Sequence, residues 1–259
     1  MLEINNVYDI DCIEGMRQIE DKAIDMILCD LPYGVTSKNK WDNIIPFDLM
    51  WEQVERIIKD NGAILFFAQD KFTAKLMLSN ERIHRYNIIW DKELPSGFLN
   101  ANKQPLRSHE DIVVFYKKLP VYNPQKVKGN KCHSKGKSVG KDNDDCYNNQ
   151  NYNNFKLVET EGDMKFPTSI WHFPKPHPSV SIHPTQKSLE LCRYAIRTYT
   201  NMGDTVLDFC CGSGTTLKAA QLEGRNYIGM DNGICENKGQ FKDWKWAEVS
   251  KYRLEKMEG

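Results

Sequence analysis

One short stretch near the start of the chain brings together an acid, a rigid turn and an aromatic ring, as Asp30-Leu31-Pro32-Tyr33-Gly34. A carboxylate can accept hydrogen bonds from an amine, proline restricts the backbone, and a tyrosine ring offers a face on which a base can stack. Proline and glycine also end many ordinary strands. The stretch is therefore a candidate site whose weight depends on the rest of the chain.

A second candidate lies far downstream, where residues 208–216 read Asp-Phe-Cys-Cys-Gly-Ser-Gly-Thr-Thr. Gly212 and Gly214 allow the backbone to approach a ligand closely, and a helix that begins at Thr215 offers N–H groups to it. Asp231 ends the next predicted strand, where a carboxylate can accept hydrogen bonds from ribose hydroxyls. The loop lacks the third glycine usual for a pyrophosphate, which favours a nucleoside without phosphates, such as S-adenosylmethionine.

Both candidates follow apolar runs that predict buried strands, at 23–29 and 205–208. Strands that alternate with helices predict a doubly wound, mostly parallel α/β sheet, which binds ligands at the carboxyl ends of its strands. The other strands are expected at 7–10, 63–67, 88–90, 112–116 and 226–230. Helices are expected at 13–19, from 48 to a stop at 61–62, at 72–77, at 188–199, from 215 to about 223 and near 244–254.

Composition is that of a globular protein without membrane or secretion signals. The 259 residues have a formal net charge of zero, and no run approaches the roughly 18 apolar residues that cross a bilayer. The first residues lack a signal peptide's basic start and apolar core, so a cytoplasmic location without a membrane partner is expected. The eight cysteines form no Cys-x-x-Cys pair, and Cys132, His133 and Cys146 fit no standard zinc spacing. Reduced thiols and no metal are expected.

Charge is uneven along the chain. Eight lysines and no acidic residue occur between Lys117 and Lys141, and an Asn-rich run follows through Asn154. Such a run is consistent with a solvated loop or with a flexible arm that contacts phosphates.

The order of the motifs is more specific than any one of them. The chain resembles the β group of DNA amino-methyltransferases, in which an Asp-Pro-Pro-Tyr element precedes a Phe-x-Gly-x-Gly element and a target-recognition region lies between them. The segment 183–187, His-Pro-Thr-Gln-Lys, resembles the start of that family's cofactor half. The resemblance implies a seven-stranded, Rossmann-like methyltransferase fold with permuted motif order. It divides the chain into a catalytic half (1–118), a target-recognition insert (119–179) and a cofactor-binding half (180–259).

The resemblance also implies residue roles. The Asp30 carboxylate and the Leu31 carbonyl would accept the amino hydrogens of a target base, Pro32 would fix the turn and Tyr33 would stack on the base. Leu31 replaces the family's first proline, which is tolerable because its carbonyl is used. S-adenosylmethionine would be the cofactor, DNA the substrate, and no metal or covalent enzyme intermediate would be needed. The implied cofactor-binding residues are Asp11, Asp30, Thr185, Lys187, Asp208, Cys210, Gly212, Ser213, Gly214, Thr215 and Asp231.

Two of these assignments, and one further pair of residues, have structural alternatives. The alternative for Asp11 is an acid that ends a strand or caps a helix. The alternative for Lys187 is a solvated lysine at the start of a helix. His109-Glu110 is either a target contact or a structural pair.

The favoured function is site-specific methylation of adenine N6 in DNA within restriction-modification, with a homodimer expected from the family. Cytosine N4 is the alternative; that subgroup more often has serine where this chain has Asp30. An RNA or protein N-methyltransferase usually carries its glycine loop upstream of the catalytic element. A non-catalytic DNA-binding subunit is the remaining hypothesis.

Overall fold

The computed structural model describes residues 1–34, 43–129, 163–177, 181–182, 186–236 and 239–256. They form two compact units, of which the larger comprises Met1–Asn123 with Ser169–Gly259 and the smaller Pro124–Thr168. Within the smaller unit, β6 (Val127–Lys128) pairs antiparallel with β7 (Met164–Lys165).

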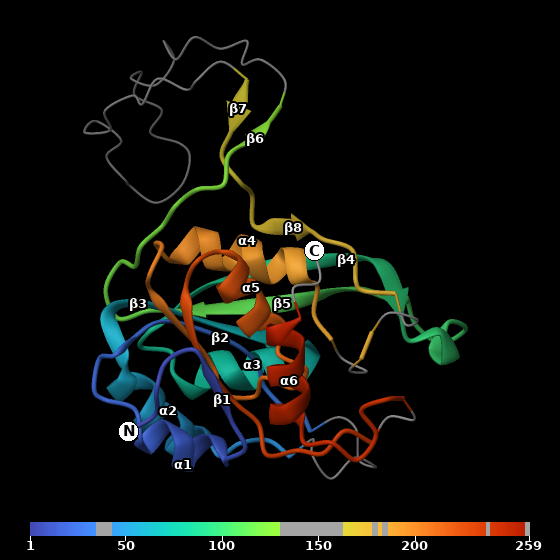
Figure 1. Ribbon diagram of the computed structural model, residues 1–259. Helices are drawn as coiled ribbons and strands as arrows, with labels where there is room; N and C mark the ends of the chain where they lie inside the picture. The colour runs from blue at the N-terminus through green and yellow to red at the C-terminus, as the bar shows by residue number, and fades with distance from the viewer. Residues whose placement is uncertain (35–42, 130–162, 178–180, 183–185, 237–238, 257–259) are drawn as a thin grey trace, which may run out of the picture. The chain divides into compact units, whose positions relative to one another are not determined.

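The larger unit is built on an eight-stranded sheet (Figure 1). Every neighbouring pair is parallel except β3–β5 and β4–β5. The predicted doubly wound, mostly parallel α/β fold is thus confirmed, with one strand more than the seven expected. In spatial order the strands are β1 (Asn6–Tyr8), β10 (Asn226–Met230), β9 (Thr205–Asp208), β2 (Ile24–Asp30), β3 (Ile58–Ala68), β5 (Arg107–Phe115), β4 (His84–Ser96) and β8 (Ile170–His172).

The additional strand, β8, comes from the range 119–179 that was predicted to be an insert. It pairs parallel with β4 along the outer edge of the sheet, with Trp90 opposite Trp171. The Trp171 side chain is buried against the ring of Tyr194, whose centroid lies 4.8 Å away. Residues 170–172 are therefore part of the large sheet.

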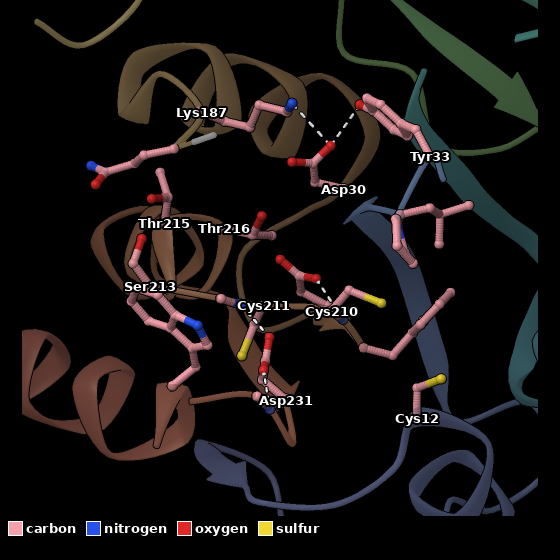
Figure 2. A pocket seen from close by; sticks show the side chains of 18 of the residues that line it. Cys12, Asp30, Tyr33, Lys187, Cys210, Cys211, Ser213, Thr215, Thr216 and Asp231 are labelled. Atoms are coloured by element: carbon pink, nitrogen blue, oxygen red, sulfur yellow. Dashed lines mark hydrogen bonds and ion pairs between the residues drawn. The ribbon is translucent and has the colours of Figure 1, made fainter. Parts of the chain in front are cut away.

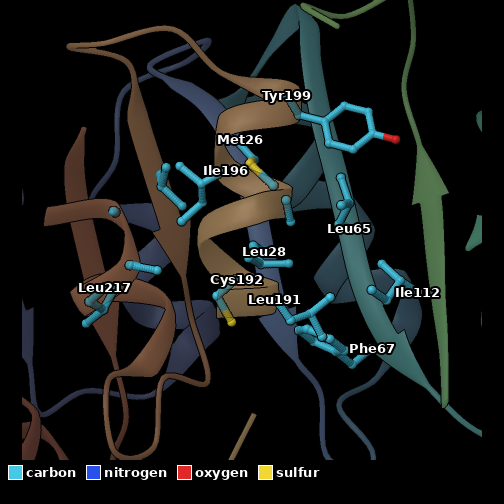
Figure 3. Packing of buried hydrophobic residues seen from close by; sticks show 14 of the residues in the cluster. Met26, Leu28, Leu65, Phe67, Ile112, Leu191, Cys192, Ile196, Tyr199 and Leu217 are labelled. Carbon is cyan, nitrogen blue, oxygen red and sulfur yellow. The ribbon is translucent and has the colours of Figure 1, made fainter. Parts of the chain in front are cut away.

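Both faces of the sheet are covered by helices, because the central strands are apolar on both sides. Alternate residues of β2 and β3 belong to two separate buried clusters, as the period of two in a strand requires. One cluster lies under α4 and α5 (Figure 3), and the other lies under α1, α2 and α3. The helices are α1 (Cys12–Arg17), α2 (Phe47–Ile57), α3 (Asp70–Ser79), α4 (Leu189–Tyr199), α5 (Thr215–Leu222) and α6 (Trp246–Glu255), with a short 3-10 helix, η1 (Phe98–Asn100).

The expected end of the second helix at residues 61–62 is wrong. α2 ends at Ile57, and β3 begins at the next residue. Gly62 lies in a bulge, since the β2–β3 register shifts between Ile24 and Met26. A Cβ on Gly62 would come within 2.8 Å of the Asp25 carbonyl oxygen. The glycine thus permits close strand approach and does not stop a helix.

The sheet reverses its winding between β2 and β9. From β2 the chain continues to β3 on one side, and from β9 it continues to β10 on the other. The two strands are parallel, with Ile27 opposite Leu207. Ligands bind beyond the carboxyl ends of strands at such a switch point, so the two candidate motifs meet at one edge.

The larger unit holds the chain by hydrogen bonds at both points where segment 124–168 begins and ends. The Asn123 side-chain amide donates to the carbonyls of Arg197 and Thr200 at the end of α4. The Ser169 carbonyl accepts a 2.8 Å hydrogen bond from the Ile89 N–H in β4. Among the described residues, none of the helices is long and apolar enough to cross a bilayer.

Packing around β10 gives a test of the fold. A Cβ at Gly229 would lie 2.3 Å from Leu217 Cδ1 and 3.2 Å from Val7 Cγ1, and both side chains are buried. We expect Gly229→Ala to lower the free energy of unfolding by about 1–3 kcal/mol through overpacking, measured by urea denaturation. Gly239→Ala is the matched control, because nothing lies within 4 Å of its Cβ position. Equal stabilities of the two variants would contradict this packing.

Candidate active site

A cavity of about 590 Å³ opens at the carboxyl ends of β2, β9 and β10. Its volume suits a small-molecule ligand. Every predicted site residue that the structure describes lines it, except Gly214; Thr185 lies outside the described residues. Figure 2 shows these side chains converging from segments far apart in the sequence. The predicted residues at the cavity are Asp11, Asp30, Leu31, Pro32, Tyr33, Lys187, Asp208, Cys210, Gly212, Ser213, Thr215 and Asp231.

Asp30, at the end of β2, is held through one carboxylate oxygen. Oδ1 accepts a 2.7 Å hydrogen bond from the Tyr33 hydroxyl and lies 2.9 Å from the Lys187 ammonium. The other oxygen is turned away from both partners (Figure 2). Burial raises the pKa of Asp30 above its usual value, and the Lys187 charge opposes this shift without cancelling it. The site thus has an oriented carboxylate with one oxygen toward the cavity.

Lys187 lies directly before α4 and connects two acids. Its ammonium is 2.9 Å from Asp30 Oδ1 and 2.9 Å from Glu110 Oε2. It also lies 5.0 Å from the ring centroid of Phe67, within cation–π range. Burial alone would lower the pKa of Lys187, but the two carboxylates outweigh it and raise the pKa. The lysine is 8% exposed, which excludes the solvated alternative. Its contact with a cofactor carboxylate stays a prediction.

Glu110 extends this network into the antiparallel part of the sheet. It lies within β5, and its Oε1 is 3.2 Å from the ammonium of Lys92 in β4. Burial alone would raise the pKa of Glu110, but Lys187 and Lys92 lower it below its usual value. Glu110 and Lys92 both line the cavity, whereas His109 is exposed. Glu110 is thus a structural partner at the site, and Lys92 is a site residue that sequence analysis missed.

The rest of the catalytic stretch is fixed by packing. The Leu31 side chain is 3% exposed and belongs to the buried cluster under α2. That burial explains why leucine is acceptable at this position, since its backbone still lies at the cavity. The Tyr33 ring packs against Phe72 of α3, with centroids 5.0 Å apart.

The glycine loop is held by Asp231 and α6. Asp231 accepts 2.8 Å hydrogen bonds from the N–H groups of Gly212 and Gly233, one on each oxygen. Ser250 of α6 donates to the Gly212 carbonyl at 2.7 Å. Gly214 has φ +78°, and a Cβ there would come 2.8 Å from Ser250 Oγ. Only glycine therefore fits beside α6, and no local sequence pattern indicates this contact.

Further groups at the loop are suited to a polar ligand. Asp208 accepts a hydrogen bond from the Cys210 N–H, and burial raises the pKa of Asp208 to about 7. Among the described residues, the buried Thr215 Oγ1 has no hydrogen-bond partner. Because buried hydroxyls are nearly always bonded, this orphan group at the α5 N-terminus indicates a missing ligand. Carboxylate acceptors beside a hydroxyl group fit a nucleoside that carries cationic and hydroxyl groups.

Asp11 does cap a helix, as its structural alternative proposed. Its Oδ1 accepts hydrogen bonds from the N–H groups of Ile13 and Glu14 at the start of α1. It also lines the cavity. The capping interaction holds Asp11 at the rim of the cavity. Its predicted role beside the cofactor adenine is compatible with this position and stays a prediction.

The lysine-rich run is partly engaged within the protein. Lys117 donates to the carbonyls of Glu55 and Ile58, and Lys118 pairs with Asp60. In the smaller unit, Lys128 lies 3.6 Å from Asp163. The lysines at 131, 135, 137 and 141, with Cys132, His133 and Cys146, lie outside the described residues.

Removal of Glu110's charge would leave two buried ammonium groups poorly compensated. Lys92, 2% exposed at its side chain, would lose its acidic partner. We expect Glu110→Gln to lower the free energy of unfolding by about 3 kcal/mol at neutral pH. The pKa of Lys92 is already lowered by burial and should fall further. A lysine whose folded pKa is depressed stabilises the fold less when charged, so the deficit should shrink as pH rises toward lysine's usual pKa of about 10.4.

Urea denaturation at several pH values measures this effect. The matched control, Asp60→Asn, removes the exposed pairs with Lys22 and Lys118 and should change stability little. A Glu110→Gln variant as stable as wild type at neutral pH would contradict the buried network.

Comparisons with known proteins agree with this geometry. A family model described as DNA methylase (N6_N4_Mtase) matches residues 24–237. The Type II methyltransferase M1.MboII of Moraxella bovis is 25% identical over 272 residues, which cover 93% of this chain and 97% of that protein.

Two solved structures share the fold. The M1.HpyAVI complex with SAM aligns with a TM-score of 0.61 at 21% identity, covering 97% of this chain and 99% of that one. The PvuII DNA methyltransferase, titled cytosine-N4-specific, aligns with a TM-score of 0.60 at 15% identity, covering 96% and 92%. The predicted recognition and cofactor are confirmed: the chain belongs to the N6/N4 DNA methylase family, the β-group amino-methyltransferases that use S-adenosylmethionine.

Proposed function

We propose that this DNA methyltransferase transfers a methyl group to the N6 amino group of adenine. The observation that carries the proposal is Asp30, an oriented carboxylate at the end of β2 whose Oδ1 is already bound by Tyr33 and Lys187. The favoured alternative to adenine, cytosine N4, belongs to a subgroup that more often has serine at this position.

The chemistry requires an amine to be made nucleophilic. The lone pair of an exocyclic amine is delocalised into the ring of the base. The second oxygen of Asp30 and the Leu31 carbonyl would accept the two amino hydrogens and direct the lone pair, while Tyr33 stacks on the base. Stacking on an aromatic side chain contributes about 1–3 kcal/mol per base. Bound S-adenosylmethionine would supply the electrophilic methyl group: the methyl–sulfur bond would break as the nitrogen–methyl bond forms, S-adenosylhomocysteine would leave, and one amino proton would pass to water. Alignment and electrostatics would provide the acceleration.

The other predicted residues are proposed to hold the cofactor. Asp231 would bind the ribose hydroxyls, Asp11 would lie near the adenine, and Gly212 and Ser213 of the loop would approach the methionine part, with Gly214 supporting the loop beside α6. Thr215 supports this placement, because its buried hydroxyl has no hydrogen-bond partner in the part of the chain that the structure describes. The range 119–179, apart from β8, is proposed as the target-recognition region, with 1–118 and 180–259 as the catalytic and cofactor-binding halves.

Asp30→Ala tests the catalytic assignment. We expect the rate of methyl transfer from tritiated cofactor to DNA to fall by at least about a hundredfold, while cofactor affinity stays within about threefold because the loop keeps its contacts. Asp21→Ala, which removes an exposed pair with Arg56, is the matched control and should retain full activity. Unchanged turnover in Asp30→Ala would exclude Asp30 from catalysis.

The same assay identifies the product. DNA methylated by wild type is digested to nucleosides and separated by mass spectrometry, and N6-methyladenine is expected. Detection of N4-methylcytosine would show that cytosine N4, and not adenine N6, is the target. Label in RNA or protein only, or in none of the three, would overturn DNA methylation by this chain.

Asp208 gives a pH-dependent prediction. Because burial raises its pKa to about 7, the carboxylate that would attract the cofactor's cationic groups becomes neutral as pH falls through that value. We expect the dissociation constant of S-adenosylmethionine, measured by calorimetry, to rise about tenfold per pH unit below 7. The cofactor's own ammonium remains charged there, since α-amino groups titrate at about 7.7–8.0. Asp208→Asn should bind more weakly with most of this slope lost; an unchanged slope would contradict the assignment.

A further inference from the structure

An ordered apolar tip projects from the sheet between β4 and β5. We define the β4–β5 tip as residues 97–106, which contain η1 and form the far end of the green hairpin in Figure 1. Phe98 is 80% exposed and Leu99 is 99% exposed. The backbone is held by its own hydrogen bonds, from the N–H of Asn100 to the Gly97 carbonyl (2.9 Å) and from Lys103 to Asn100 (2.8 Å). The two apolar side chains are thus presented to solvent by a folded turn.

The base of this tip lies at the catalytic cavity. Ser96, the last residue of β4, lines the cavity beside Lys92 and Glu110. Two residues of chain span at most about 7 Å, so Phe98 begins within that distance of the cavity lining. On the other strand, Arg107 donates to Gln69 and pairs with Asp70 at the start of α3. The tip is therefore fixed next to the opening that a target base must enter.

The charge of the tip suits a polyanion. Within residues 97–106 there is no acidic side chain, and Lys103 is basic. Exposed amides at Asn100, Asn102 and Gln104 surround the apolar pair. Amide and basic side chains contact phosphates and base edges in protein–DNA complexes. This composition, with its continuity to the cavity, favours DNA over a second copy of the chain as the occupant.

We propose that Phe98 and Leu99 form a wedge that enters the duplex beside the target and fills the space the flipped base vacates. An enzyme that acts on a base must take it out of the stack, and apolar side chains inserted between base steps open duplexes in this way. The inference rests on DNA as the substrate and is independent of the choice between adenine and cytosine.

The test compares two duplexes that carry the recognition sequence found by methylome sequencing of a host expressing the protein. In one duplex the target base is paired, and in the other it is mispaired and so already weakly held. We expect the Phe98→Ala/Leu99→Ala variant to methylate the paired duplex about tenfold more slowly than wild type, a factor equivalent to about 1.4 kcal/mol. On the mispaired duplex its rate should return to within about threefold of wild type.

Leu78→Ala is the matched control, because Leu78 is also an exposed apolar residue (68%) but lies near the end of α3 that leads away from the cavity. It should match wild type on both duplexes. Equal losses of the tip variant on both duplexes, or no loss on either, would overturn the wedge. A change of oligomeric state in the tip variant, measured by sedimentation, would make the tip a subunit contact and would also overturn it.

A second readout separates failure of the wedge from failure of the proposed function. A 2-aminopurine at the target position fluoresces when it leaves the stack, without any methyl transfer. Wild type should raise this fluorescence, and the tip variant should raise it at least about fivefold less at saturating protein. Equal fluorescence with both proteins would disprove the wedge even if the methylated base differs from adenine.

Discussion

The candidate site is organised around the partly buried Asp30 carboxylate and the charges that surround it. Burial favours the neutral acid, and the Lys187 ammonium opposes it. Burial of the Lys187 ammonium without a second acidic partner would be costly. Glu110 is that second partner, and Lys92 forms an ion pair with the other oxygen of Glu110. Charges of alternating sign therefore run from β2 through the start of α4 to β5 and β4. Because Lys187 belongs to the half of the chain that carries the glycine loop, this network also joins the two motif-bearing halves at the atom proposed to do the chemistry.

The sheet determines which residues can join that network. Reversal of winding between β2 and β9 brings Asp30 and Asp208 to the same edge, although they are far apart in the sequence. The antiparallel pairing of β4 with β5 then places Lys92 close to Glu110 on the cavity side. On the other side of the cavity, α6 closes over the glycine loop through Ser250. The end of the cavity proposed to hold the base and the end proposed to hold the cofactor are thus formed by separate elements at the same edge of the sheet.

Sequence alone could predict the fold class, because apolar runs locate the strands, and the motifs with the family resemblance pointed to most of the residues that the structure places at the cavity. It failed where geometry depends on partners distant in the chain. Asn61-Gly62 looks like a helix stop, yet the glycine serves a bulge against Asp25. The strand β8 has only three residues, which are too few to show the alternation of apolar and polar residues that predicts a strand. The contact of Ser250 with the loop, and the sharing of Lys187 between Asp30 and Glu110, depend on topology that no local pattern encodes.

The two anchored ends of the larger unit have a consequence for how such chains diversify. Asn123 is tied to the end of α4, and Ser169 to β4. The bonds at Asn123 and Ser169 lie within the larger unit, so they do not themselves involve the side chains of residues 124–168. The segment proposed to select the DNA sequence is thus attached at two points that its own residues do not define, an arrangement that would let relatives vary the segment and keep the same attachment.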